Sequence, residues 1–131
     1  MKDLKILEHE VLQMLLRGDD DCLAILRSQA QQASVSLREM TGIGFFTHLV
    51  VPSEVPRVPG QPKFQLGDVN GTAENVKDGL GFVLFITDGA LSMLEGYTYD
   101  EPWPDEFRGL VLGYSTGQAR DLDQVRKSIA G

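Results

Sequence analysis

A short acidic loop in the C-terminal half of the chain contains the residue types best suited to chemistry. The stretch reads DEPWPDE, and its four carboxylates are Asp100, Glu101, Asp105 and Glu106. Carboxylate oxygens are ligands for calcium, but the spacing lacks the ligand pattern and the turn glycine of an EF-hand. We therefore expect the protein to use neither a metal ion nor another cofactor.

The only tryptophan in the chain, Trp103, lies in the same loop between two prolines. A residue that precedes proline is restricted to extended conformations. Glu101 and Trp103 therefore have little conformational entropy left to lose on binding a partner. Two interpretations are open: the indole fills one end of the core, or it is a preformed contact for a basic partner. On the second interpretation, the predicted partner-binding surface comprises Tyr97, Tyr99, Asp100, Glu101, Trp103, Asp105 and Glu106.

A separate carboxylate, Glu95, belongs to the strongest hairpin pattern in the chain, which has an Asp-Gly turn at 88–89. This dipeptide is a preferred two-residue turn, because both central positions adopt positive φ. The register that follows from the turn places Phe82 opposite Glu95 and Gly81 opposite Gly96. Since opposed residues share a face of the sheet, we predict Glu95 on an otherwise apolar face and a bare patch at the two glycines.

A carboxylate on an apolar face has three interpretations. It can lie in water at the edge of the sheet, or it can be buried with a partner such as Arg38, Arg108 or a tyrosine hydroxyl, because an unpaired interior charge is costly. It can also lie at the mouth of a pocket with a raised pKa and act as a general base. His48, which alternates with apolar residues, could line such a pocket with Glu95. No motif marks either residue as catalytic, so the structural interpretations are preferred.

Other signatures of catalysis or metal binding do not occur in the sequence. The two histidines have no spaced partners that would complete a metal site, and there is neither a GxSxG elbow nor the Gly-Lys-Ser/Thr of a P-loop. The single cysteine, Cys22, cannot form an internal disulfide and is expected to be a small buried apolar group. These absences favour a protein that is not an enzyme.

The net charge of −7, from nineteen acidic and twelve basic side chains, argues against some partners. Nucleic acids present a polyanionic backbone, so direct nucleic-acid binding is disfavoured. An acidic surface suits solubility or attraction to a basic protein. The chain contains neither the apolar stretch of a signal peptide nor a run of about 18 apolar residues, so we expect a cytoplasmic protein without membrane contact.

The elements that must position these residues follow a simple order. Apolar spacing of three to four residues predicts a helix over 4–17 and a second helix that contains Leu23, Leu26 and Ala30. One of the aspartates at 19–21 can cap the second helix, and a short helix capped by Asp121 ends the chain. Strand patterns lie between them, at 35–39, 44–52, 64–69, 81–99 and 110–115. We therefore predict a single α+β domain, residues 1–131, in which two N-terminal helices pack on a mostly antiparallel sheet of five or six strands.

Two stretches resemble segments of small bacterial proteins of uncharacterised function. They are TGIGFFTHLVV at 41–51 and GFVLFITDGALSMLEGYTYDEPWP at 81–104, and together they cover about a quarter of the chain. Some proteins of this kind are encoded beside toxins, in the manner of immunity proteins. The resemblance implies a stand-alone intracellular domain that acts by binding, and it assigns no function to particular residues.

These observations predict a non-enzymatic binding protein, with immunity-type neutralisation of a basic toxin as its most specific form. Two alternatives remain open. One is a small enzyme or ligand-binding domain, with Glu95 and His48 in a pocket on the sheet. The other is a structural homo-oligomeric subunit that pairs through a sheet edge or through the glycine patch.

Overall fold

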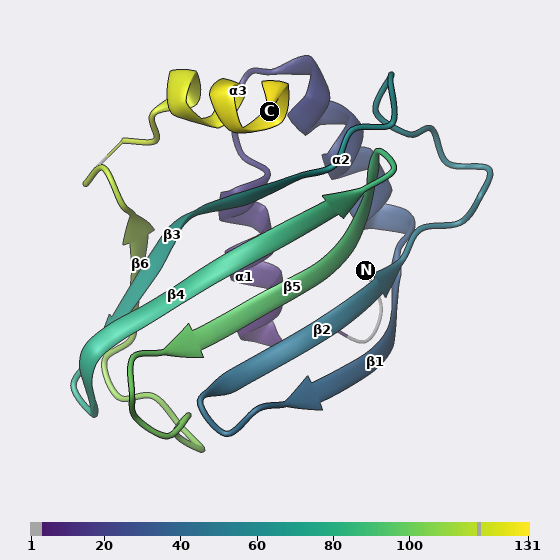
Figure 1. Cartoon of the computed structure of the whole chain (residues 1–131). Coiled ribbons are helices and arrows are strands. Elements are labelled where there is room, and N and C mark those ends of the chain that lie inside the picture. Colours follow the sequence, from purple (N-terminus) through teal and green to yellow (C-terminus); the bar gives the residue numbers. More distant parts are fainter. Residues whose placement is uncertain (1–3, 118) are drawn as a thin grey trace.

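Two helices, six strands and a final helix follow one another in the computed structural model, which describes residues 4–117 and 119–131 (Figure 1). In chain order they are α1 (Ile6–Leu15), α2 (Asp21–Gln32), β1 (Ser34–Met40), β2 (Gly44–Val50), β3 (Phe64–Ala73), β4 (Val76–Thr87), β5 (Ala90–Thr98), β6 (Val111–Tyr114) and α3 (Leu122–Ala130). The predicted α+β class is confirmed, with the six strands in one antiparallel sheet.

The second and third helices begin at aspartate caps. Asp20 accepts a hydrogen bond from the Leu23 amide at the start of α2, and Asp121 accepts one from the Gln124 amide at the start of α3. Each bond satisfies an amide that the first helical turn leaves without a backbone partner. Gly18, with a φ of +140°, lies in the short link between α1 and α2. The link lets the two helices lie on the same side of the sheet.

The strands lie in the order β1-β2-β5-β4-β3-β6, with the β4–β5 hairpin at the centre. The chain reaches β3 from β2 through a connection at 51–63 that contains four prolines. Both N-terminal helices pack behind the sheet, α1 against β3 and β4 and α2 against β5. None of the described elements covers the other face of the sheet in Figure 1.

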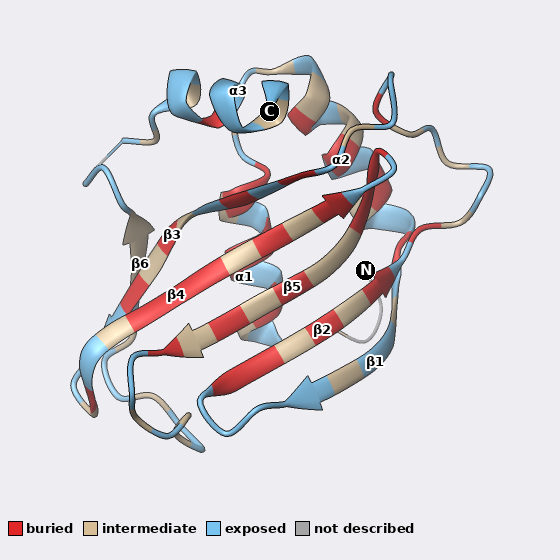
Figure 2. Ribbon diagram, viewed as in Figure 1, coloured by how far each residue is buried: buried red, intermediate tan, exposed pale blue. Residues whose placement is uncertain are grey.

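Burial alternates along the central strands (Figure 2), because successive side chains of a strand point to opposite faces. In β2, Phe45, Thr47 and Leu49 are buried, whereas Phe46 and His48 are only partly buried. The buried side of the sheet meets the apolar faces of α1 and α2. The fully buried residues that make this core include Val11, Leu15, Leu23, Leu26, Val69, Phe82 and Leu84.

A buried glutamine, Gln29, joins three parts of the fold that are distant in sequence. Its amide nitrogen donates to the Pro56 and Gly89 carbonyls at 3.1 and 2.9 Å, and its amide oxygen accepts from the Leu91 amide at 3.0 Å. The side chain is fully buried, so these bonds replace the water that burial removes. They fix α2 to the tip of the β4–β5 hairpin and to the proline-rich connection.

A buried ion pair fixes α1 to the β1 edge of the sheet. Glu8, which is 2% exposed, accepts hydrogen bonds from the Arg38 guanidinium at 2.6 and 3.0 Å, from the Lys5 amide at 2.9 Å, and from the Thr47 hydroxyl. Burial by itself would raise the pKa of Glu8, but the bonds from Arg38, Thr47 and Lys5 together outweigh it and lower the pKa. Arg38, which the sequence offered as a partner for Glu95, is thus engaged with Glu8 on the helix side.

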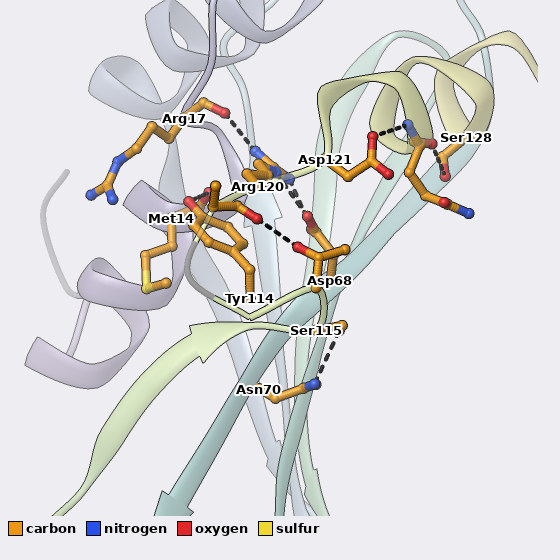
Figure 3. A network of polar contacts seen from close by, with 12 residues as sticks. Met14, Arg17, Asp68, Asn70, Tyr114, Ser115, Arg120, Asp121 and Ser128 are labelled. Atoms are coloured by element: carbon orange, nitrogen blue, oxygen red, sulfur yellow. Dashed lines mark hydrogen bonds and ion pairs between the residues drawn. The ribbon is translucent and has the colours of Figure 1, made fainter.

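A second ion pair holds the segment that leads into α3 (Figure 3). Arg120, whose side chain is 6% exposed, donates to both carboxylate oxygens of Asp68 at 2.8 and 2.9 Å and to the Arg17 carbonyl at 2.6 Å. Its guanidinium lies 5.4 Å from the centre of the Tyr114 ring, and the Tyr114 hydroxyl donates to the Met14 carbonyl at 2.8 Å. One guanidinium therefore joins the end of α1, β3 and β6.

The Asp88-Gly89 turn forms as predicted, but the register of the hairpin beyond it differs from the prediction. Ser92 has no partner on β4, so the pairs that follow it are shifted by one residue. Such an extra residue is a β-bulge. As a result, Glu95 faces Val83 across the hairpin and not Phe82.

The predicted bare patch of glycines does not form, for the same reason. Gly81 faces Tyr97, and Gly96 faces Phe82. A Cβ atom on Gly81 would collide with the Tyr97 ring, and one on Gly96 would collide with the Phe45 ring. Each glycine is therefore covered by an aromatic side chain, a pairing that compensates for the missing side chain of glycine in a strand.

Replacing Glu8 by glutamine should lower the free energy of unfolding at pH 7 by about 3 kcal/mol, because it removes one partner of a buried ion pair. The pKa of Glu8 is lowered in the folded state, so its stabilisation is present above the unfolded pKa of about 4.3 and is lost as the pH falls through the folded pKa. Chemical denaturation at several pH values measures both effects.

The matched control for this prediction is Glu10→Gln, which neutralises an exposed carboxylate of the same helix. It should change stability by less than about 0.5 kcal/mol. A loss with Glu8→Gln that stayed equally large in acid would contradict the assigned ion pair.

Candidate protein-binding surface

The sheet face opposite α1 and α2 is left uncovered by the described elements, and it is turned toward the viewer in Figure 2. Strand pairing defines which residues lie on it. Three rows cross its centre, formed by Phe46, Glu95 and Val83, by His48, Met93 and Phe85, and by Gly44, Tyr97 and Gly81. We call this surface the open face, and its central residues are Phe46, Val83, Phe85, Met93, Glu95 and Tyr97.

Apart from Glu95, the centre of the open face is apolar or aromatic. These side chains are partly buried by their neighbours on adjoining strands. Toward the β1 edge, Leu37 and Val50 are 55% and 50% exposed. Single exposed apolar side chains are ordinary, whereas a contiguous group marks a contact site. The open face therefore has the composition of a protein contact surface.

Glu95 lies in the middle of this apolar group, with Phe46 on one side and Val83 on the other. Within the described part of the chain, its carboxylate has no hydrogen-bond or ion-pair partner. Burial raises the pKa of Glu95 above its ordinary value, because partial removal from water disfavours the charged form. The carboxylate can therefore accept hydrogen bonds from a molecule that covers the face.

His48 lies on the open face too, but it contacts another carboxylate. Its Nε2 is 2.6 Å from Oε1 of Glu39, and the two side chains are 35% and 53% exposed, so water screens the pair. The open-face positions of β1, β2, β5 and Leu80–Thr87 of β4 include the carboxylates of Glu39 and Glu95 but no lysine or arginine. The charge of this surface is thus acidic.

Two tyrosines of the predicted partner-binding surface extend the open face toward the end of β5. The rings of Tyr97 and Tyr99 meet edge to face with their centroids 5.5 Å apart, and Tyr99 is 46% exposed. Burial, the hydrogen bond with Tyr99 and the nearby Glu95 carboxylate raise the pKa of Tyr97. The structure therefore brings Glu95 and this aromatic pair together.

Trp103, in contrast, packs against the core of the protein. Its ring meets those of Phe45 and Phe107 edge to face, with centroid distances of 5.3 and 5.1 Å, and its amide donates to the Gly42 carbonyl at 2.9 Å. The residue is partly buried and packs against the core. Its indole closes one end of the core while part of the residue stays exposed.

Glu101 also stabilises the loop in which it lies. Its carboxylate accepts from the Lys77 amide at 3.0 and 3.2 Å and from the Asp78 amide at 3.3 Å, and its carbonyl accepts from the Thr98 hydroxyl. These bonds hold the loop against the start of β4. The other acidic residues of the predicted surface, Asp100, Asp105 and Glu106, are exposed.

Sequence reasoning did not single out four apolar residues of the open face, Phe46, Val83, Phe85 and Met93. Their signal was the alternation along each strand, which shows that two faces differ but not which one the helices cover. On β5 the bulge at Ser92 also exchanges the two faces, so the pattern before it does not predict the pattern after it.

The three described cavities lie away from the open face. One of about 440 Å³ lies between α1 and α2, one of about 290 Å³ lies beside α1 and β6, and one of about 480 Å³ lies between β3 and α3, beside the contacts drawn in Figure 3. Glu95 and His48 line none of them. The pocket that the enzyme alternative places around these two residues is therefore not among them.

The described residues offer little for metal or thiol chemistry. Within them, no three histidine, cysteine, aspartate or glutamate side chains come together in a group that could hold a metal ion. Burial and the nearby Asp20 carboxylate raise the pKa of the Cys22 thiol to about 11, so the reactive thiolate is scarce at neutral pH.

None of the helices in the described residues is sufficiently long and apolar to cross a membrane. Comparisons of the chain with protein families, with characterised proteins and with solved structures find no match.

Replacing Trp103 by alanine should lower the free energy of unfolding by about 2–3 kcal/mol, somewhat less than the loss for a fully buried aromatic residue. The variant loses two edge-to-face ring contacts and leaves a cavity beside Phe45. Chemical denaturation followed by circular dichroism measures the loss, because the variant contains no tryptophan. Trp103→Phe keeps part of the packing and should lose less than half as much. An unchanged stability of Trp103→Ala would show that the indole does not close the core.

Replacing Glu95 by glutamine should raise the free energy of unfolding at pH 7 by about 0.5–1 kcal/mol, a fraction of the cost of a buried unsatisfied group. Burial raises the folded pKa of Glu95 above its unfolded value, so the charged carboxylate opposes folding at higher pH and ceases to do so below about pH 4. The gain should therefore disappear in acid. Denaturation at pH 7 and at acidic pH measures it, and a loss of stability at pH 7 would mean that the carboxylate has a partner.

Proposed function

We propose that this chain is a non-enzymatic binding protein that contacts a basic protein through the open face. The most specific form of this proposal is immunity-type neutralisation, in which the partner is a basic toxin. The observation that supports it is the uncovered apolar centre of the open face, with the carboxylate of Glu95 in its middle. Such a surface gains both apolar burial and an opposite charge from one basic partner.

The charge of the chain favours a basic partner over an acidic one. The net charge is −7, and the loop after β5 adds the exposed carboxylates of Asp100, Asp105 and Glu106 beyond Tyr99. Opposite charges steer a partner toward the surface and raise the association rate, most strongly at low salt. The apolar contacts at the centre would then govern how slowly the complex dissociates.

The two alternative functions have less support. An enzyme would need a pocket around Glu95 and His48, whereas the described cavities are lined by other residues and His48 contacts Glu39. A homo-oligomer that paired face to face would bring the carboxylates of Glu39 and Glu95 toward their own copies, with no lysine or arginine of the central open face to offset them.

Affinity capture from the native host with two matched variants tests the proposal. Met93→Lys adds a positive charge at the centre of the open face, and Ile6→Lys makes the same kind of change on α1, at a residue that is 81% exposed. We expect a basic protein to be captured by the wild type and by Ile6→Lys. Its recovery should fall at least tenfold with Met93→Lys, because the added charge repels a basic partner.

Thermal unfolding of both variants verifies that they are folded, and light scattering of the wild type at several concentrations tests for self-association. Equal capture by the two variants would remove the open face as the contact surface. Capture of an acidic protein would contradict the electrostatic argument, and an assembly that grows with concentration would favour the homo-oligomer.

A further inference from the structure

Glu95 and its aromatic neighbours suggest what kind of group the partner presents. Resting on the proposed function, we infer that Glu95, Phe46 and Tyr97 form a receiving site for one arginine side chain of the partner. Phe46 lies opposite Glu95 on β2, and Tyr97 lies two residues further along β5 on the same face. Opposed Cβ atoms in a sheet are about 4.5–5.5 Å apart, and next neighbours about 7–8 Å, so one guanidinium can reach all three side chains.

The first step of the argument concerns the cost of removing the carboxylate from water. An interfacial ion pair adds little affinity when both charges must lose their hydration on binding. At Glu95 part of that loss has already occurred in the free chain, because apolar side chains surround the carboxylate and no described residue bonds to it. An incoming cation therefore meets a carboxylate that is already partly desolvated, which lowers the cost of pairing.

The second step distinguishes arginine from lysine. A guanidinium is planar, is weakly hydrated, forms two parallel hydrogen bonds with a carboxylate and stacks on aromatic rings. Aromatic rings lie on two sides of Glu95, and Tyr97 is held in place by its edge-to-face contact with Tyr99 and by its position over Gly81. A lysine ammonium would form the ion pair but would gain less from the flat surfaces.

The third step concerns the titratable groups around the site. On the adjoining strands they are Glu39 on β1, His48 on β2, and Tyr97 and Tyr99 at the end of β5. The facing positions of β4 are Gly81, Val83 and Phe85, which do not titrate. Protonation of Glu95 removes the negative charge of the site, so binding of an arginine should weaken in acid.

The test is a titration followed by two-dimensional NMR of the ¹⁵N-labelled chain, with N-acetyl-arginine amide as the probe. N-acetyl-citrulline amide, which has the same shape without the charge, is the matched control ligand. We expect saturable shifts of the amides of Phe46, Val83, Met93 and Tyr97 with a dissociation constant in the millimolar range. Citrulline should bind at least tenfold more weakly, Glu95→Gln should abolish the difference between the two probes, and Glu39→Gln should keep it.

Equal shifts with the two probes, a response of Glu95→Gln equal to that of the wild type, or no saturable shift on the open face would overturn the arginine site. These outcomes are separable from those of the capture experiment. If the probe fails but Met93→Lys still loses the partner, the open face remains the contact surface without a cation site. If the probe binds but no partner is captured, the site stands and the proposed function does not.

Discussion

The ion pair between Glu8 and Arg38 fastens α1 to the side of the sheet that the helices cover. Arg38 is held on the helix side of β1 by a buried carboxylate of α1, to which the Thr47 hydroxyl also donates. Alternation along β1 places Arg38 on that side, opposite Thr47, and places Glu39 on the open face. The helix side gains a satisfied buried charge. The open-face positions of β1, β2 and β5 include the carboxylates of Glu39 and Glu95 but no lysine or arginine. The ion pair thus docks α1 with the only basic residue of β1, and alternation keeps that residue away from Glu95.

The fold could be predicted from sequence where one local signal decided the structure. The aspartates at 20 and 121 cap their helices, and the Asp88-Gly89 turn forms the central hairpin, because each depends on groups within a few residues. The polar stretch at 70–79 lies outside the predicted strands, but it is mostly strand around the short connection between Ala73 and Val76. There, pairing with β6 and β4 overrides the weak strand preference of glycine and asparagine.

The candidate surface could be predicted only in part, because its residues depend on non-local geometry. Glu95 was expected on an apolar face, and it lies on one. Its predicted cross-strand neighbour was wrong, because an alternating pattern does not reveal the bulge at Ser92. Trp103 was ambiguous, since the same two prolines preorganise a contact residue and a core residue alike. The distinction required knowledge that Phe45 and Phe107 lie beside it.

The carboxylate in the centre of the open face reconciles two needs of such a surface. An uncovered apolar face promotes self-association, and a charge within it opposes that by repelling a second copy. Either sign of charge would serve this purpose, and a lysine would be the more common choice on a strand. A carboxylate does the same work while leaving a site that only a cation satisfies. The carboxylate of Glu95 lowers the stability of the free chain, but it discourages pairing with the chain's own copies and favours a basic partner. Proteins bear such a loss of stability at binding surfaces.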